Sequence, residues 1–165
     1  MPNTPVVIRP FEAGDLPRLQ EIRAAAFAPV FASFRSLVGD ELYALALSRS
    51  DAEQADLLES LCAPASTAEV FVAMHDAGII GFVSLTLDAT RLTGEIGLNA
   101  VHPDAAGEGV GQQLYEFALD RMKAAGMKAA TVSTGGDASH APARRAYEKA
   151  GFAASVPSLW MVRSL

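Results

Sequence analysis

The chain has 165 residues, of which 50% are hydrophobic, so it holds enough apolar material for one domain with a buried core. Its 19 acidic residues against 13 basic ones give a net charge of -6 without any basic run, which excludes nucleic acid as an expected partner. Cys62 is the single cysteine, which excludes an internal disulfide and a cysteine-rich metal site. No spacing of His, Asp and Glu residues predicts a metal site either.

The first ten residues, MPNTPVVIRP, lack the charged and then apolar profile of a signal peptide. No apolar run approaches the roughly 20 residues of a membrane span. We therefore expect a cytoplasmic protein with no membrane partner.

The N-terminal part of the chain is predicted to form one strand followed by helices. A β-branched run at 6–9 predicts the strand, and Asp15 is predicted to cap a first helix. A second helical region is expected over 27–37, where aromatic residues recur at helical spacing. Residues 39–64 continue as one or two amphipathic helices, with Asp51 as a predicted cap.

The middle of the chain is predicted to form an antiparallel meander. Residues 70–76 and 78–88 form a hairpin, and its second arm leads into a third strand at 95–101. After the meander we expect a helix that starts at Val110, a strand at 128–134 and a short helix that Gly151 ends. Two further strands, at 153–155 and 159–163, are expected to close the sheet.

Three glycines at every second position, Gly107, Gly109 and Gly111, stand at the start of the predicted helix. The first turn of a helix has unpaired N–H groups and partial positive charge, and glycines let an anion approach the backbone there. A phosphate-bearing ligand is therefore the first hypothesis. A nucleotide-triphosphate loop is excluded because Gln112 and Gln113 follow Gly111, where that loop needs Lys and Ser or Thr.

A dinucleotide site is the second alternative. It requires Gly-x-Gly-x-x-Gly with an acidic residue about 20 positions later, and Asp137 follows the next predicted strand. The glycine spacing differs, however, and a Rossmann-type sheet alternates strand and helix from the start, which the meander does not do. Too little chain follows to complete a doubly wound sheet.

Two motifs in the second half of the chain have a joint spacing that is more specific than the glycines. They are V-x-P-x-x-x-G-x-G-x-G-x-x-L, starting at Val101, and A-x-x-x-Y-x-x-x-G-F, starting at Ala143. Together they resemble the GNAT superfamily of acyl-CoA-dependent N-acyltransferases. The resemblance implies an α/β (α+β) fold class over a single domain, 1–165, with a mixed, mostly antiparallel central sheet flanked by helices. It also implies acetyl-CoA as co-substrate and transfer of acetyl to a primary amine of a small molecule or peptide.

The resemblance also implies where the cofactor binds. The backbone between Gly107 and Gln112 would hold the pyrophosphate, and the strand end from Asn99 to Val101 would pair with the pantetheine arm. Two positions depart from the family pattern: Ala106 stands where Arg or Gln is usual, and His140 replaces an asparagine seven residues before the tyrosine. The implied cofactor-binding residues are Asn99, Val101, Ala106, Gly107, Gly109, Val110, Gly111, Gln112, His140 and Tyr147.

Tyr147 occupies the place of the family's tyrosine that can protonate the thioester sulfur, so it is the predicted acid. Glu95 lies on the strand where several family members carry a glutamate that acts as the general base, directly or through water. Partial desolvation in a groove would raise the pKa of its carboxylate toward neutrality, which suits a base. Asp137 is the second choice of base, and ordered water is a further alternative. In a GNAT-like chain the second helical region borders the acceptor groove, so Phe31, Phe34 and Arg35 are candidate substrate contacts.

Two broader alternatives stay open. A domain of the same fold that binds CoA without catalysis fits the departures at Ala106 and His140. The oligomeric state also stays open: members of such families often pair through sheet edges or C-terminal strands, and the apolar run LWMV at 159–162 would suit such a contact in a homodimer.

Overall fold

A computed structural model of the chain describes residues 6–76 and 78–165. In this part of the chain, five strands form one sheet in the order β1-β2-β3-β4-β5. Strands β1 to β4 run antiparallel to their neighbours, and β5 runs parallel to β4. The predicted mixed, mostly antiparallel sheet is therefore confirmed. The strands are β1 (Val7–Pro10), β2 (Glu69–His75), β3 (Gly78–Asp88), β4 (Thr93–Val101) and β5 (Ala129–Val132).

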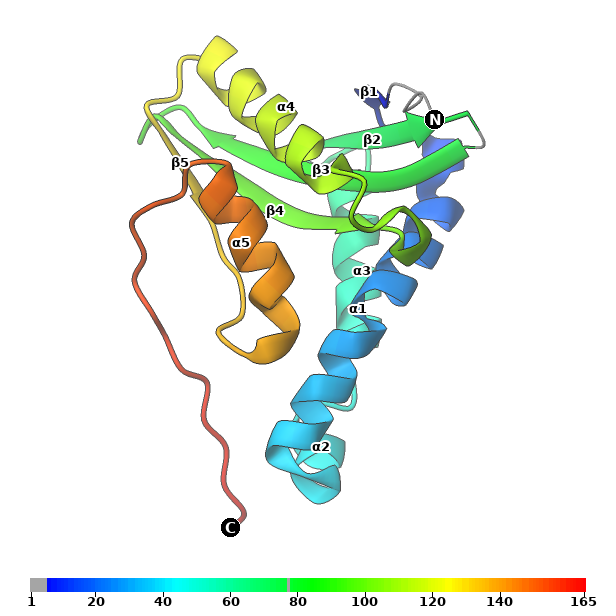
Figure 1. The fold of residues 1–165 in the computed structure, drawn as a ribbon, viewed down its shortest axis with the longest axis vertical. Coiled ribbons are helices and arrows are strands. Elements are labelled where there is room, and N and C mark those ends of the chain that lie inside the picture. The colour runs from blue at the N-terminus through cyan, green and yellow to red at the C-terminus, as the bar shows by residue number, and fades with distance from the viewer. Residues whose placement is uncertain (1–5, 77) are drawn as a thin grey trace.

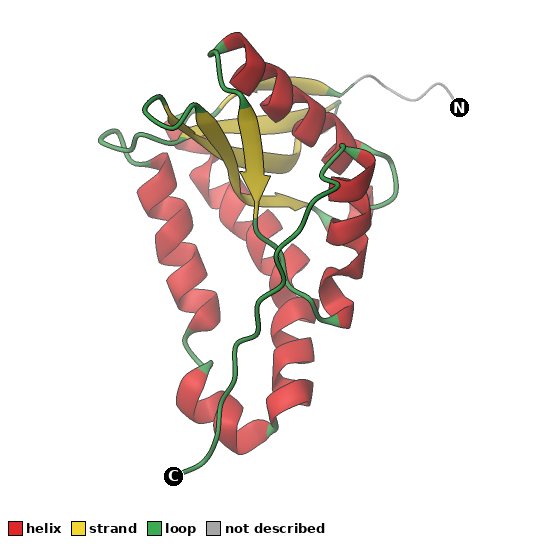
Figure 2. Ribbon diagram, turned by 90° about the vertical axis from the view of Figure 1, so that its left-hand side faces the viewer, coloured by secondary structure: helices red, strands yellow, loops and turns green. Residues whose placement is uncertain are grey.

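Helices cover both faces of the sheet (Figures 1 and 2). Helices α1 (Leu16–Val38) and α3 (Ser50–Cys62) share a core with one face, and α4 (Val110–Ala124) and α5 (Ala141–Lys149) share a core with the other. Helix α2 (Asp40–Ala46) joins α1 to α3 at the end farthest from the sheet. Three short 3-10 turns complete the order: η1 (Ala13–Asp15), η2 (Pro103–Ala105) and η3 (Ala138–His140).

The two cores follow from the side-chain alternation of the strands. In β2, Val70 and Val72 pack with Leu19 of α1 on one face, whereas Phe71 and Ala73 belong to the core beneath α4. Successive side chains of a strand point to opposite faces, so a strand that is apolar at every position is buried on both. The near-continuous apolar run of β2 therefore requires a helical layer on each side of the sheet.

The N-terminal helices differ from the sequence prediction in two ways. The first two predicted helical regions form one continuous helix, α1, with Pro29 inside it. Asp15 is the N-cap residue of α1, as predicted, but its side chain makes no capping hydrogen bond, and the N-cap of α3 is Arg49 in place of Asp51. The Asp15 carboxylate accepts from the Arg9 guanidinium at 2.7 Å, and Asp51 lies inside the first turn of α3, where it pairs with the buried Arg23 at 2.7 Å. Both carboxylates form ion pairs with arginine side chains in place of capping hydrogen bonds.

The closing strands predicted at 153–155 and 159–163 are wrong. Residues 153–165 form no regular secondary structure, and they run from the end of α5 toward the level of α2 (Figure 1). A strand needs a neighbour for its backbone hydrogen bonds, and this path leads away from the sheet. The segment exposes large apolar side chains, at Val156, Leu159, Trp160, Met161 and Leu165.

None of the helices in the described ranges is long and apolar enough to cross a membrane. Within the same ranges, no group of three or more His, Cys, Asp or Glu residues is arranged to hold a metal ion.

Candidate active site

A cleft of about 940 Å³ lies where β4 and β5 separate. The two strands pair only along residues 93–96 of β4, and β5 ends at Val132 while β4 continues to Val101. The second half of β4 therefore has β3 on one side and the cleft on the other. Residues from α1, the start of α4, η3 and α5 form the remaining walls.

A bulge in β4 marks the point where this separation begins. Ser84 of β3 lies opposite two residues, Gly97 and Leu98, and its hydroxyl donates to the Leu98 carbonyl at 2.9 Å. A side chain at Gly97 would place its Cβ 2.7 Å from the Ser84 Oγ, so only glycine fits there. Bulges increase twist and redirect a strand. This bulge precedes the segment from Asn99 to Val101, which the sequence predicts to pair with the pantetheine arm.

The glycine loop leads into α4 at one end of the cleft. Gly107 and Gly109 have φ angles of 82° and 79°, in the left-handed region that favours glycine, and Gly109 is the N-cap of α4. No side chain caps this helix, so its first N–H groups are left for a ligand. At Gly111 an added Cβ would meet only Val101, at 3.9 Å. Two of the three glycines are thus required by backbone conformation.

Further polar groups of α4 and α5 face the same cleft. The Gln112 Nε2 donates to Glu116 at 3.0 Å, whereas the Gln112 Oε1 is buried and has no hydrogen-bond partner among the described residues. A buried acceptor of this kind calls for a donor from a ligand or water. Arg145 and Lys149, one helical turn apart on α5, are exposed and line the cleft. Their positive charges suit an anionic ligand.

A chain of hydrogen bonds from Tyr115 through Asn99 fixes the orientation of the Tyr147 hydroxyl. Burial, together with the nearby Tyr147, raises the pKa of Tyr115 far above its usual range, so Tyr115 stays protonated and donates to the Asn99 Oδ1 at 2.9 Å. The Asn99 Nδ2 in turn donates to the Tyr147 oxygen at 3.1 Å. Because the Tyr147 oxygen accepts this bond, its own proton is free to be donated to a group in the cleft.

All of the predicted cofactor-binding residues, together with the predicted acid Tyr147 and base Glu95, line this cleft. They come from β4, the glycine loop with the start of α4, and α5: Glu95, Asn99, Val101, Ala106, Gly107, Gly109, Val110, Gly111, Gln112, His140 and Tyr147. Glu95 is exposed, in contrast to the partial desolvation that its sequence argument assumed.

The candidate contacts on α1 and the second-choice base lie elsewhere. None of Phe31, Phe34 and Arg35 is among the residues that line the cleft, although Phe34 packs against His140, which does line it. Arg35 instead pairs with Asp40 at 2.5 Å. Asp137 lies beside the cleft and holds His140.

Sequence reasoning missed Tyr115, Arg145 and Lys149. The signal for the two basic residues was present, because they stand four apart on a helix and so share one face. No local sequence pattern indicated a role for Tyr115, because its hydrogen-bond partner Asn99 lies on β4.

Comparisons with known proteins agree with this geometry. The sequence profile of the acetyltransferase (GNAT) family matches residues 32–152. The chain belongs to this family. A search of curated proteins found no match.

Solved structures of GNAT enzymes share the fold. The PaiA N-acetyltransferase from Thermoplasma acidophilum in complex with coenzyme A has a TM-score of 0.70 at 19% identity, over 93% of this chain and 93% of that one. The ribosomal-protein-S18-alanine N-acetyltransferase from Escherichia coli has a TM-score of 0.66 at 19% identity, over 92% and 80%. A GNAT acetyltransferase from Brucella melitensis in complex with acetyl-CoA has a TM-score of 0.60 at 22% identity, over 92% and 84%. The predicted GNAT fold is confirmed.

Proposed function

We propose that the chain is an N-acetyltransferase, which moves the acetyl group of acetyl-CoA directly to a primary amine of a small molecule or peptide. The observation that carries this proposal is the Tyr147 hydroxyl, whose oxygen accepts from the Asn99 Nδ2 and whose proton is therefore left to donate, in the same cleft as the glycine loop. An acid there can protonate a departing sulfur, whereas a domain that only binds CoA has no need of it.

The residues of the cleft fit acetyl-CoA. The free N–H groups at the start of α4 suit the pyrophosphate, and Arg145 and Lys149 add positive charge for phosphate groups. The buried Gln112 Oε1 offers an acceptor to an amide N–H or hydroxyl of the ligand. When bound, acetyl-CoA supplies the activated acetyl thioester. The missing Arg or Gln at Ala106 removes a side-chain contact and leaves the backbone cradle in place.

Different groups of the chain would carry out the separate steps of the acetyl transfer. A backbone N–H in the segment from Asn99 to Val101 polarises the carbonyl oxygen, as the resemblance implies. Tyr147 gives its proton to the leaving sulfur. Glu95 is the base predicted from the sequence, but it is exposed on the cleft wall, so the partial desolvation on which that prediction rested is absent.

The test is an acetylation assay on the purified protein. We would incubate it with acetyl-CoA and a panel of primary amines, comprising a polyamine, an aminoglycoside and peptides with free N-termini, and detect acetylated products by mass spectrometry. Transfer to at least one amine supports the proposal. Saturable binding of acetyl-CoA without transfer to any amine would instead favour the non-catalytic CoA-binding domain.

The proposal extends to a second copy of this chain as partner. The apolar segment 156–165 is exposed, and β5, at the edge of the sheet, pairs only with β4 among the described residues. An open strand edge is a template for pairing with another chain. We therefore propose a homodimer in which this segment of one copy packs at the β5 edge of the other.

A further inference from the structure

A partly buried Asp–His pair lies in the loop between β5 and α5, at the side of the cleft. The His140 Nδ1 is 2.6 Å from the Asp137 Oδ1, and the two side chains are only 16% and 13% exposed. His140 lines the cleft, whereas Asp137 does not. The resemblance implies only that His140 takes the place of a cofactor-binding asparagine, which would not require such a partner.

The surroundings of Asp137 fix the orientation of the imidazole. The Asp137 Oδ2 accepts from the Ser33 hydroxyl of α1 at 2.9 Å, from the Ser139 N–H at 3.2 Å and from the Ser139 hydroxyl. Burial alone would raise the pKa of Asp137, but the hydrogen bonds from Ser139, His140 and Ser33 outweigh it and hold that pKa well below its usual range.

An ionised carboxylate only accepts hydrogen bonds, so the Nδ1 of His140 must carry the proton. The neutral ring then has its lone pair on Nε2. No hydrogen bond of this Nε2 is found among the residues that the structure describes, so it is the nitrogen left for a substrate.

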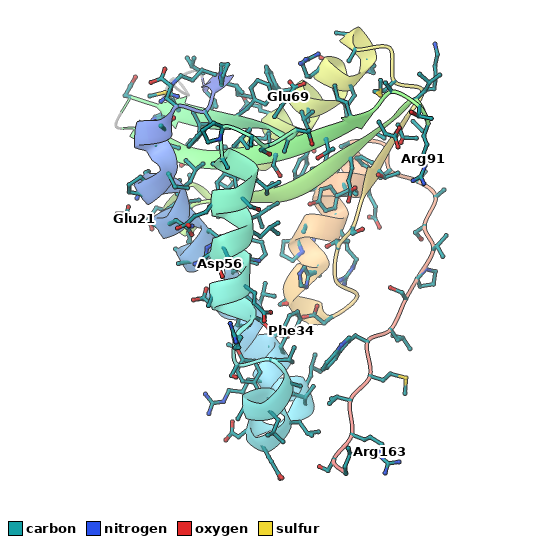
Figure 3. The ribbon with its side chains drawn as sticks, turned by 180° about the vertical axis from the view of Figure 1, so that it is seen from behind. Glu21, Phe34, Asp56, Glu69, Arg91 and Arg163 are labelled. Atoms are coloured by element: carbon teal, nitrogen blue, oxygen red, sulfur yellow. The ribbon has the colours of Figure 1, made fainter. Side chains whose placement is uncertain are left out.

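The backbone around the pair is shaped to accept it. A Cβ at Gly135 would lie 2.3 Å from the His140 Nδ1 and 2.7 Å from the Asp137 Oδ1, so the pair needs glycine at this position. Arg144 holds the same loop by donating to the carbonyls of Gly135 at 2.6 Å and Asp137 at 2.7 Å. The Phe34 ring of α1 stacks on the imidazole with a centroid distance of 6.0 Å. Figure 3 shows Phe34 beside this loop.

We propose that His140 is the base that takes the proton from the acceptor ammonium, and that Asp137 is its positioning residue. This inference rests on the proposed function. The His140 Nε2 takes one ammonium proton, and the nitrogen lone pair forms the bond to the thioester carbon. The C–S bond breaks, and the sulfur leaves with the electron pair and takes the Tyr147 proton. The nitrogen then loses its second proton, which restores Tyr147, and the imidazolium returns its proton to solvent.

Among the charged and titratable groups that line the cleft, His140 is the partly buried candidate for the base. From its own loop Asp137 faces it, and from α5 the nearby Arg144 is engaged by two carbonyls. On α1 the contacts are Ser33 and Phe34, which do not titrate. Of the other charged cleft residues, Glu95, Arg145 and Lys149 are all exposed.

The test compares kcat/KM against pH for the wild type, His140→Asn, Asp137→Asn and Glu95→Gln, with an amine from the panel that the wild type acetylates. The acidic limb of such a profile reports protonation of the essential base in the free enzyme. His140→Asn should lower kcat/KM at neutral pH by about 10²-fold or more and abolish the limb. Asp137→Asn should lower kcat/KM at neutral pH, because an amide can donate to Nδ1 and leave the proton on Nε2, where no lone pair then remains for the ammonium proton.

Glu95→Gln distinguishes the two bases. We expect it to keep the acidic limb in place, and the inference is overturned if the limb is lost in Glu95→Gln and kept in His140→Asn. Thermal unfolding of each variant shows whether a loss of activity reflects a loss of fold.

A second readout does not depend on activity. The Nδ1–H bonded to Asp137 should give a protected ring N–H signal in proton NMR, which disappears in both His140→Asn and Asp137→Asn. Absence of this signal from the wild type would overturn the Asp–His pair. If the wild type acetylates no amine, the proposed function fails and the base with it, while the NMR result still reports on the pair.

Discussion

Asp137 is the residue whose environment most clearly departs from that of an exposed carboxylate. Its pKa is lowered in the folded protein, so its contribution to stability is complete above the unfolded pKa of about 3.9 and is lost as the pH falls through the lower folded value. We predict that Asp137→Asn lowers the free energy of unfolding by about 1.5–3 kcal/mol at pH 7 and by progressively less below about pH 4. Denaturant unfolding at several pH values measures this difference.

Asp120→Asn is the matched control, because Asp120 is exposed and, among the described residues, forms an ion pair only with Lys123 on the surface of α4. It should change stability by less than about 0.5 kcal/mol at any of these pH values. An Asp137 effect that does not shrink in acid would contradict the account.

At the same scale, the sequence could place residues in the cleft but could not describe their side-chain contacts. Asn99 was predicted for its backbone, and its amide proved to connect Tyr115 with Tyr147. The partners lie 16 and 48 positions away, and no local pattern records such a contact. Asp137 was considered as a base, but its role as the partner of His140 depends on Ser33 of a distant helix.

At the scale of elements, we predict that alanine substitutions at two positions of the glycine loop have different effects on stability and on acetyl-CoA binding. Gly109→Ala should cost about 1–2 kcal/mol, because φ is 79° there, and should weaken acetyl-CoA binding by moving the first N–H groups of α4. Gly111→Ala is the matched control, since its Cβ has space and alanine favours the helix, so stability should stay the same or rise by about 0.5–1 kcal/mol. Denaturant unfolding and calorimetric titration measure the two effects. Equal effects of both changes would show that the loop conformation is not what the glycines provide.

The order of elements could be predicted because period and turn residues are local signals. The hairpin of β2 and β3, β4 and α4 start and end close to their predicted positions. The bulge at Gly97 could not be predicted, since it depends on the Ser84 hydroxyl of the neighbouring strand. The C-terminal strands failed for the opposite reason: the apolar run at 159–162 is typical of a strand, but it has no pairing partner among the described residues.

At the scale of the whole molecule, the exposed C-terminal segment makes the homodimer testable. Light scattering after size exclusion should report a dimer for the wild type and a monomer for a variant with Trp160→Asp and Met161→Asp. Leu45→Asp is the control, because Leu45 is also an exposed apolar residue but lies on α2, and it should stay dimeric. A monomeric wild type would refute the proposed contact.

The two helical layers and the separation of β4 from β5 bring together residues from strand, loop and helix around Tyr147. The most direct test of the proposed transferase is therefore kcat for Tyr147→Phe with an amine that the wild type acetylates. Removing the hydroxyl takes away the proton donor and leaves the ring in its core, so kcat should fall by about 10²-fold while acetyl-CoA still binds. Unchanged turnover in a folded variant would contradict the acid role of Tyr147 and the observation on which the proposed function rests.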